Sequence, residues 1–177
     1  MSTRPALFMG PWTKYSVLHD VFACTGGTGS PSSSGSWYGA NIAQFMPVVL
    51  PWPYPVKRFW VWNGSGVVGN WDIGLFSSDG AKLTSTGAFA AAGTNAIQFQ
   101  AANPTYIAPP GQYYIGISTN SGSQPIFIIS QNDRMSRISG CLKLTSAHPL
   151  PASFGTPASF TDGIFVMAGF TLTESWF

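Results

Sequence analysis

The chain has 177 residues, of which 45% are hydrophobic, 15% aromatic and only 8% charged, and its formal net charge is +2. This length fits one domain, and the hydrophobic fraction is large enough for a core, which argues against wholesale disorder. The eight Lys and Arg residues are scattered rather than gathered into a basic stripe, so we expect no nucleic-acid binding.

The first residues show neither a basic segment followed by an apolar run nor, here or later, the roughly 18 apolar residues of a membrane span. We therefore expect synthesis in a cytoplasm and no membrane insertion. Cys24 and Cys141 are too few for a disulfide framework. Two buried thiols are the expected state in a cytoplasmic product, and a bridge between them is the alternative.

Residues 1–24 form a short arm that is rich in apolar side chains and too short to be a domain. We expect it to dock on its own body or on a neighbour as an assembly arm, through Trp12, Tyr15 and Phe22 among others. Residues 25–36 are dense in Gly and Ser, which predicts a flexible linker or loop. Residues 37–177 then form the body.

Strand signals recur along the body at short intervals, with turn residues between them and no convincing helical period. The predicted strands span residues 43–50, 56–63, 70–76, 82–86, 95–100, 111–118, 125–130, 137–145 and 163–173. About nine short strands without intervening helices predict an all-β fold, an antiparallel β-sandwich.

The predicted strand at residues 56–63, VKRFWVWN, is apolar on both faces, since Phe59 and Val61 alternate with Trp60 and Trp62. An antiparallel sheet commonly leaves one face in water, so the second apolar face here needs a cover. A loop or the arm of the same chain is one candidate cover. The other is a subunit contact or a ligand platform, because Trp is enriched at interface hot spots.

Residues 64–69, GSGVVG, match the spacing of a dinucleotide-binding loop, but a strand-like segment follows where that motif requires a helix. We interpret residues 69–83 instead as a β-hairpin with its turn at SSDG. Neither His19 nor His148 has a second metal ligand at a suitable spacing, so no metal site and no cofactor are expected.

Candidate catalytic groups are few. His19 and Cys24 are a possible base–nucleophile pair that no motif supports. Most carboxylates lie in turn contexts. Asp72 is the exception, since it alternates with apolar residues, and we expect it to bond backbone at a sheet edge or to ligate a cation. The sequence therefore predicts that the protein is not an enzyme.

Three segments in this order carry a resemblance: FMPVVLPWPYPVKRFWVWNGSG, then GNWDIGLFSSDGAKLTSTGAFAAAGTNAIQ, then YIAPPGQYYIGIST. Together they resemble the β-sandwich modules of bacteriophage virion proteins, which are similar to jelly-roll carbohydrate-binding domains. The resemblance covers residues 45–119 and implies a jelly-roll-like fold without shared catalytic residues. It also accounts for a low-charge, aromatic-rich protein with no export signal, because virions assemble in the host cytoplasm.

The resemblance implies a non-enzymatic structural protein on the virion surface, as a tail or fibre component or a capsid decoration. Its expected partners are other virion proteins and further copies of itself, in a homo-oligomer that covers Trp60 and Trp62, with a trimer favoured. The alternative is a free-standing glycan-binding module, which would also let a virion attach to a host-surface glycan. Candidates for interface contact or sugar stacking are Trp37, Tyr38, Trp52, Tyr54, Trp60 and Trp62.

Overall fold

The computed structural model describes residues 21–24, 31–130, 140–160 and 164–171; the side chains of 21–24, 31–34, 129–130 and 164–165 are outside the description. Within these ranges the chain is all-β and contains no helix. Its strands are β1 (Val21–Cys24), β2 (Pro31–Ser36), β3 (Ile42–Leu50), β4 (Tyr54–Trp62), β5 (Asn70–Ser77), β6 (Lys82–Ser85), β7 (Phe89–Ala90), β8 (Ile97–Ala108), β9 (Gly111–Thr119), β10 (Pro125–Ser130), β11 (Leu142–Leu144), β12 (Ala158–Ser159), β13 (Ile164–Val166) and β14 (Ala168–Thr171).

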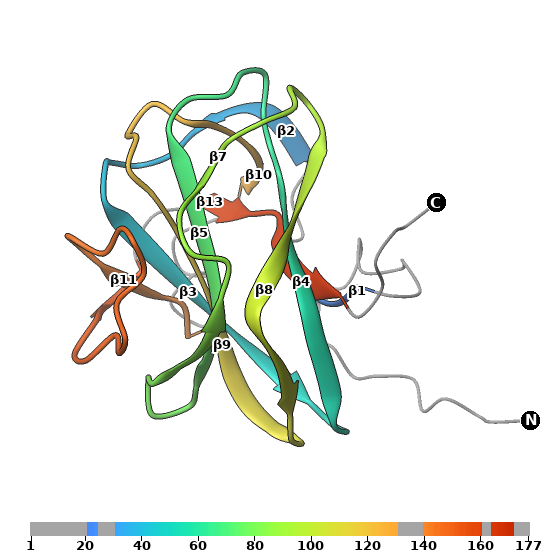
Figure 1. Ribbon diagram of the computed structural model, residues 1–177. Helices are drawn as coiled ribbons and strands as arrows, with labels where there is room; N and C mark the ends of the chain where they lie inside the picture. Colours follow the sequence, from blue (N-terminus) through green and yellow to red (C-terminus); the bar gives the residue numbers. More distant parts are fainter. Residues whose placement is uncertain (1–20, 25–30, 131–139, 161–163, 172–177) are drawn as a thin grey trace, which may run out of the picture.

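The strands pair antiparallel, and one long strand, β8, joins two groups of strands (Figure 1). On one side β8 pairs with β4, followed by β14 and β1. On the other side a single residue pair joins it to β6, and the order continues through β5, β9, β3, β11 and β12. A small separate sheet has the order β13, β10, β2.

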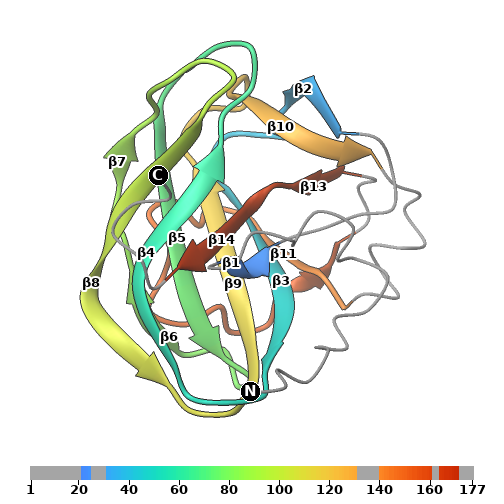
Figure 2. The ribbon, with the colours of Figure 1, turned by 90° about the vertical axis from the view of Figure 1, so that its right-hand side faces the viewer.

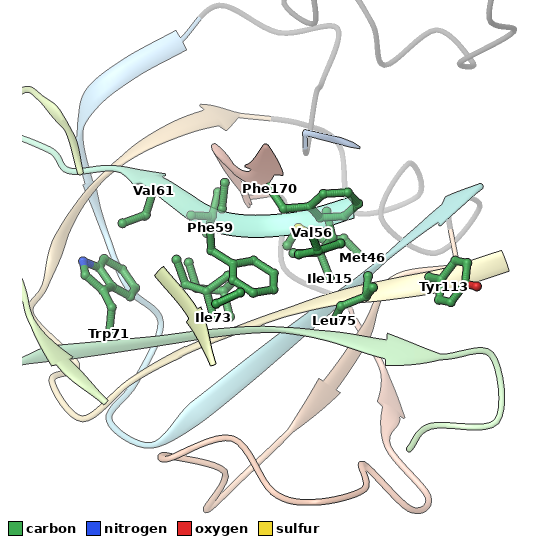
Figure 3. Packing of buried hydrophobic residues seen from close by; sticks show 14 of the residues in the cluster. Met46, Val56, Phe59, Val61, Trp71, Ile73, Leu75, Tyr113, Ile115 and Phe170 are labelled. Carbon is green, nitrogen blue, oxygen red and sulfur yellow. The ribbon is translucent and has the colours of Figure 1, made fainter. Parts of the chain in front are cut away.

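The two groups of strands lie face to face in a sandwich-like arrangement, with β14, β4 and β8 in front of β5, β9 and β3 in Figure 2. Alternation places Phe59 and Val61 of β4 toward the interior, where they share one buried cluster with Trp71, Ile73 and Leu75 of β5 (Figure 3). Two apolar sheet faces that bury each other are the dominant source of stability in such a fold.

The predicted hairpin is confirmed, since β5 and β6 pair antiparallel. Its turn closes through Ser77, whose backbone N–H donates to Ala81 O at 2.9 Å and whose hydroxyl bonds Asp79. Gly80 has φ of +91° and lies against the Phe154 ring, so both backbone conformation and space require glycine there. The residues 64–69 connect β4 to β5, as expected of a loop between strands.

Three parts of the chain differ from the predictions. Residues 31–36, the second half of the segment predicted as a Gly- and Ser-rich linker or loop, form β2 and pair with β10. The predicted strand at 163–173 is two strands, β13 and β14, that enter different sheets. The strand predicted at 95–100 extends to residue 108, because residues 102–105 bulge opposite Lys57 and let Pro104 sit where no ladder N–H is needed.

Residues 140–160 form a second layer outside the sandwich, at the left of Figure 1. They carry β11, which extends the sheet beyond β3, and Ala147, Leu150 and Phe154, which pack on Phe45 and Phe76 from the outward face of β3 and β5. We call residues 140–160 the cover segment. The outer face of this sheet is therefore buried by the chain itself.

Candidate functional site

The six aromatic candidates do not form one surface. Trp60 and Trp62 lie on the outer face of β4, and Trp37 and Tyr38 follow β2. Trp52 and Tyr54 lie where the chain crosses from β3 to β4. The six candidates therefore lie at three separate places in the fold, two residues at each.

Trp37 and Tyr38 pack in the core and form hydrogen bonds with the beginning of β3. The Trp37 ring is buried, and its indole N–H donates to Ile42 O at 3.2 Å. Tyr38 stacks on Trp37 with ring centroids 4.5 Å apart and donates its hydroxyl to Gln44 Oε1 at 2.8 Å. Sugar stacking needs an open ring face, and Trp37 offers none.

Tyr54 is likewise buried, and its ring lies 5.4 Å from that of Phe170. Trp52 is half-buried between Pro51 and Pro53, both of which are exposed. Of the two candidates in this connection, Trp52 is partly exposed and Tyr54 is not.

The outer face of β4 holds a small aromatic cluster of its own. Trp60 and Met167 are buried, and Trp62, Ile97, Phe99 and Phe127 pack against them. Trp62 stacks on Phe127 with centroids 4.1 Å apart and ring planes within 10°. Trp60 is only 4% exposed in a single chain, so no second copy is needed to bury it.

The polar atoms of this cluster are unusual. The indole N–H groups of Trp60 and Trp62 are buried, and neither has a hydrogen-bond partner among the residues that the structure describes. By contrast, Trp71, fully buried in the main core, donates its indole N–H to Asn63 Oδ1 at 2.8 Å. Sequence reasoning located this face but had no means of detecting the unpaired donors.

The arm is described only at its end. Residues 21–24 form β1, which pairs with β14, so they belong to the sheet. Trp12 and Tyr15 lie outside the described residues. Phe22 lies in β1, but its side chain is outside the description, as is that of Cys24; Cys141 is buried in the main core.

One end of the sandwich is apolar and exposed. The register pairs Leu50 with Gly111 and Tyr54 with Ala108, so the connections 51–53 and 109–110 lie side by side at the lower end of Figure 1. Val49 and Ile107, at this end, are 64% and 69% exposed. We call this surface, formed by residues 47–55 and 105–112, the proline end.

The proline end contains no charged residue, and Pro51, Pro53, Pro109 and Pro110 are exposed on it. Tyr113 braces the second connection by donating its hydroxyl to Pro109 O at 2.6 Å. The sequence predicted both turns, but no local signal showed that turns so far apart in the chain meet in space.

A buried polar cluster lies beneath the cover segment. Asp72 is 1% exposed, and its carboxylate accepts hydrogen bonds from Leu150 N at 2.9 Å and from Thr86 Oγ1 at 3.2 Å. Lys82 Nζ donates to Leu150 O at 2.7 Å. Both peptide groups of Leu150 are thus held by charged side chains.

These contacts settle the role of Asp72 between the two predicted alternatives. It bonds backbone, although in a central strand rather than at a sheet edge. Burial raises the pKa of the Asp72 carboxyl, whereas the hydrogen bond from Leu150 and the charge of Lys82 act to lower it. The Asp72 carboxylate thus fixes the cover segment through Leu150.

Ser118 and His148 lie beside Asp72, with 3.0 Å between Ser118 Oγ and His148 Nδ1. Burial lowers the pKa of His148, and the nearby Asp72 charge acts to raise it. Nucleophilic catalysis requires a hydroxyl that substrate can reach and a histidine oriented by a carboxylate. Here Ser118 is fully buried, and the Asp72 carboxylate accepts its hydrogen bonds from Leu150 and Thr86.

Among the residues that the structure describes, no group of three or more His, Cys, Asp or Glu side chains is placed to hold a metal ion. No helix in the described ranges is long and apolar enough to cross a membrane. In comparisons with known proteins, no family model matches the chain, and no curated protein matches it.

Proposed function

We propose that this protein is a non-enzymatic structural protein of a bacteriophage virion surface, a tail or fibre component or a capsid decoration. In this proposal its jelly-roll-like sandwich is assembled in the host cytoplasm and works through contacts with other virion proteins and with copies of itself. The observation that supports a contact function is the proline end, where Val49 and Ile107 are mostly exposed.

The chemistry of the proline end suits association. Burying apolar area is favourable by about 25 cal/mol per Å², and no charged residue there has to lose its hydration. Exposed prolines have few conformations to lose on binding, which lowers the entropic cost of association. A stiff, uncharged, apolar surface of this kind is typical of a site that another protein covers.

The proposed self-association is a closed homo-oligomer, with a trimer favoured, in which the proline ends meet near the symmetry axis. Light scattering at micromolar concentration measures the mass. We expect Val49→Lys with Ile107→Lys to give a folded monomer, because charges there would have to be buried unpaired. The matched control is Val68→Lys, since Val68 is 48% exposed at the opposite end of β4 and should leave the oligomer intact.

A wild-type protein that remains monomeric, or a double Lys variant of unchanged mass, would refute self-association through the proline end. The virion location is tested separately by labelling purified particles with an antibody to this protein in electron micrographs. Absence of label from the particles would refute the virion assignment, even if the oligomer forms.

A second candidate function is glycan binding at the same end, where Trp52 is half-exposed between two prolines. Sugar rings stack on such aromatic faces. A glycan array with wild type and Trp52→Ala tests it. Binding that the substitution abolishes supports the glycan module, and absence of binding to any sugar refutes it.

A further inference from the structure

The proline end carries more hydrogen-bond acceptors than donors. Pro51, Pro53, Pro109 and Pro110 each have a carbonyl oxygen but no backbone N–H, so the connections 51–53 and 109–110 offer few donors. One of these oxygens is paired within the chain, since Tyr113 donates its hydroxyl to Pro109 O at 2.6 Å. A partner that covers this end must therefore supply donors as well as apolar area.

Tyr106 lies on this surface and has a hydroxyl that the described chain does not use. It precedes the exposed Ile107 in β8, and its ring is half-buried against the main core. Its hydroxyl makes no hydrogen bond with the described residues. Among these residues, the shielded side-chain donors without a partner are the indoles of Trp60 and Trp62, so the Tyr106 hydroxyl is open to solvent.

An electrostatic effect places this hydroxyl at the proline end. Burial raises the pKa of Tyr113, and the nearby Tyr106 raises it further. The two phenol groups therefore lie near each other, and that of Tyr113 contacts the 109–110 connection. The structure thus contains one tyrosine hydroxyl that donates to a carbonyl of a proline connection, and a second, unused one beside it.

The symmetry of a ring determines which parts of two proline ends meet. In a cyclic oligomer of more than two copies, each contact joins two different patches. The proline end has two patches, residues 47–55 and residues 105–112, whose connections lie side by side. The 105–112 patch of one copy then faces the 47–55 patch of the next. The first patch holds the Tyr106 donor, and the second holds the carbonyl acceptors of the 51–53 connection.

We propose that the Tyr106 hydroxyl donates across this contact to a carbonyl of the 51–53 connection in the next copy of the chain. The proposal rests on the self-association proposed above for the proline end. It adds the polar contact that fixes how the copies are oriented, because apolar contact alone is non-directional. Tyrosine suits this role, since its ring supplies apolar area and its hydroxyl a directional bond.

Sedimentation equilibrium of Tyr106→Phe tests the proposal, because this change removes the hydroxyl and keeps the ring. We expect the concentration of half-assembly to rise roughly tenfold, since every contact in the ring loses a hydrogen bond. Tyr38→Phe is the matched control. Its hydroxyl bonds Gln44 within the chain, near the opposite end of β3, so assembly should keep the wild-type concentration dependence.

The possible results separate this proposal from the function on which it rests. A monomeric wild type would refute both. An oligomeric wild type whose half-assembly concentration is unchanged in Tyr106→Phe would overturn this proposal and leave the self-association standing. If Tyr106→Phe assembles normally but no longer binds on a glycan array, the hydroxyl contacts a sugar rather than a second copy, and the proposal is wrong.

Two single variants test which patches meet. Val49→Lys places a charge in the 47–55 patch, and Ile107→Lys places one in the 105–112 patch. Each variant alone should be monomeric, whereas an equimolar mixture well above the wild-type half-assembly concentration should contain pairs, because each variant retains the patch that the other lacks. A mixture that stays monomeric, or a single variant that keeps the wild-type mass, would overturn the proposed contact.

Discussion

The two outer faces of this sandwich are buried in different ways. On β5 and β3 the cover segment is held by directional contacts, since Asp72 accepts a hydrogen bond from Leu150 N and Lys82 donates one to Leu150 O. On β4 the face is aromatic, and the indole N–H groups of Trp60 and Trp62 have no hydrogen-bond partner within the described part of the chain. Both faces are buried, but among the described residues only the first has its buried polar side chains paired.

The two faces specify the position of their covering segments in different ways. Apolar contact is non-directional and fixes a covering segment only loosely along the strand. A buried carboxylate that accepts from one particular N–H fixes the residue opposite it, because any shift would leave a charge unpaired. The cover segment therefore has a defined register on its sheet, whereas the described contacts of the β4 face are apolar and aromatic and define no such register.

Removing the carboxylate should break the first face. Asp72→Ala leaves Leu150 N buried without an acceptor and removes the nearby counter-charge of Lys82, so we expect a loss of about 3–5 kcal/mol in the free energy of unfolding. Urea denaturation measures it. Asp79→Ala, at an exposed turn, is the control and should cost much less. Equal losses would show that the anchoring contact contributes nothing special.

Two tryptophans compare a paired with an unpaired indole. Trp71→Phe shrinks a fully buried side chain and strands Asn63 Oδ1, so we expect a loss of about 3 kcal/mol. Trp62→Phe keeps the stack on Phe127 on a half-buried side chain and should cost about 1 kcal/mol. Thermal unfolding of both variants measures the difference, and its reversal would contradict the contrast between the faces.

The sequence predicted much of the fold because alternation is a local signal. Strands such as β3, β5, β9 and β10 have clear apolar alternation or apolar runs, and their positions are confirmed. The strand β2, PSSSGS, has none, so its pairing with β10 through the backbone was not predictable from its side chains. The jelly-roll topology and the phage resemblance stay predictions.

Adding a methyl group at Gly116, on the first face, should lower the free energy of unfolding moderately. A Cβ at Gly116 would lie 2.7 Å from Phe76 Cε2 and 2.9 Å from Phe45 Cδ1, and both rings are held by Phe154. We expect Gly116→Ala to cost about 2 kcal/mol by overpacking. Gly111→Ala is the matched control, since its nearest neighbour would be the Tyr113 ring at 3.5 Å, an ordinary contact. Equal stability of the two variants in urea would show that the face can relax.

The functional surfaces were harder to predict than the strands because they depend on contacts between distant parts of the chain. Asp72 stood out in the sequence as a carboxylate among apolar residues, but its partner Leu150 is 78 residues away. The proline end likewise needs the pairing of β3 with β9 and of β4 with β8 before its two turns meet. Local patterns identify such residues as unusual without showing what they contact.

The smallest expected effect is a pH dependence that belongs to the first face alone. Burial lowers the pKa of His148 below the 6.5 of an exposed histidine, so the unfolded chain binds this proton more readily than the folded one. Stability is then full above pH 6.5 and falls as the pH drops below it. The raised pKa of Asp72 has the opposite sign, since the folded state gains stability as the pH falls through that pKa toward 3.8.

His148→Gln separates the two contributions, because it removes the histidine proton and leaves Asp72 in place. We expect the decrease in unfolding free energy between pH 7 and pH 5.5 to become shallower in this variant, as measured by urea denaturation at closely spaced pH values. His19→Gln is the control for the other histidine. The pKa of His148, followed by its ring proton resonances, should fall further in Asp72→Asn, because the neighbouring negative charge that favours the imidazolium is gone. An unchanged pKa in that variant would mean that the charge of Asp72 does not act on His148, and the hydrogen bonds of Asp72 and Lys82 to Leu150 would then hold the first face without any coupling to the histidine.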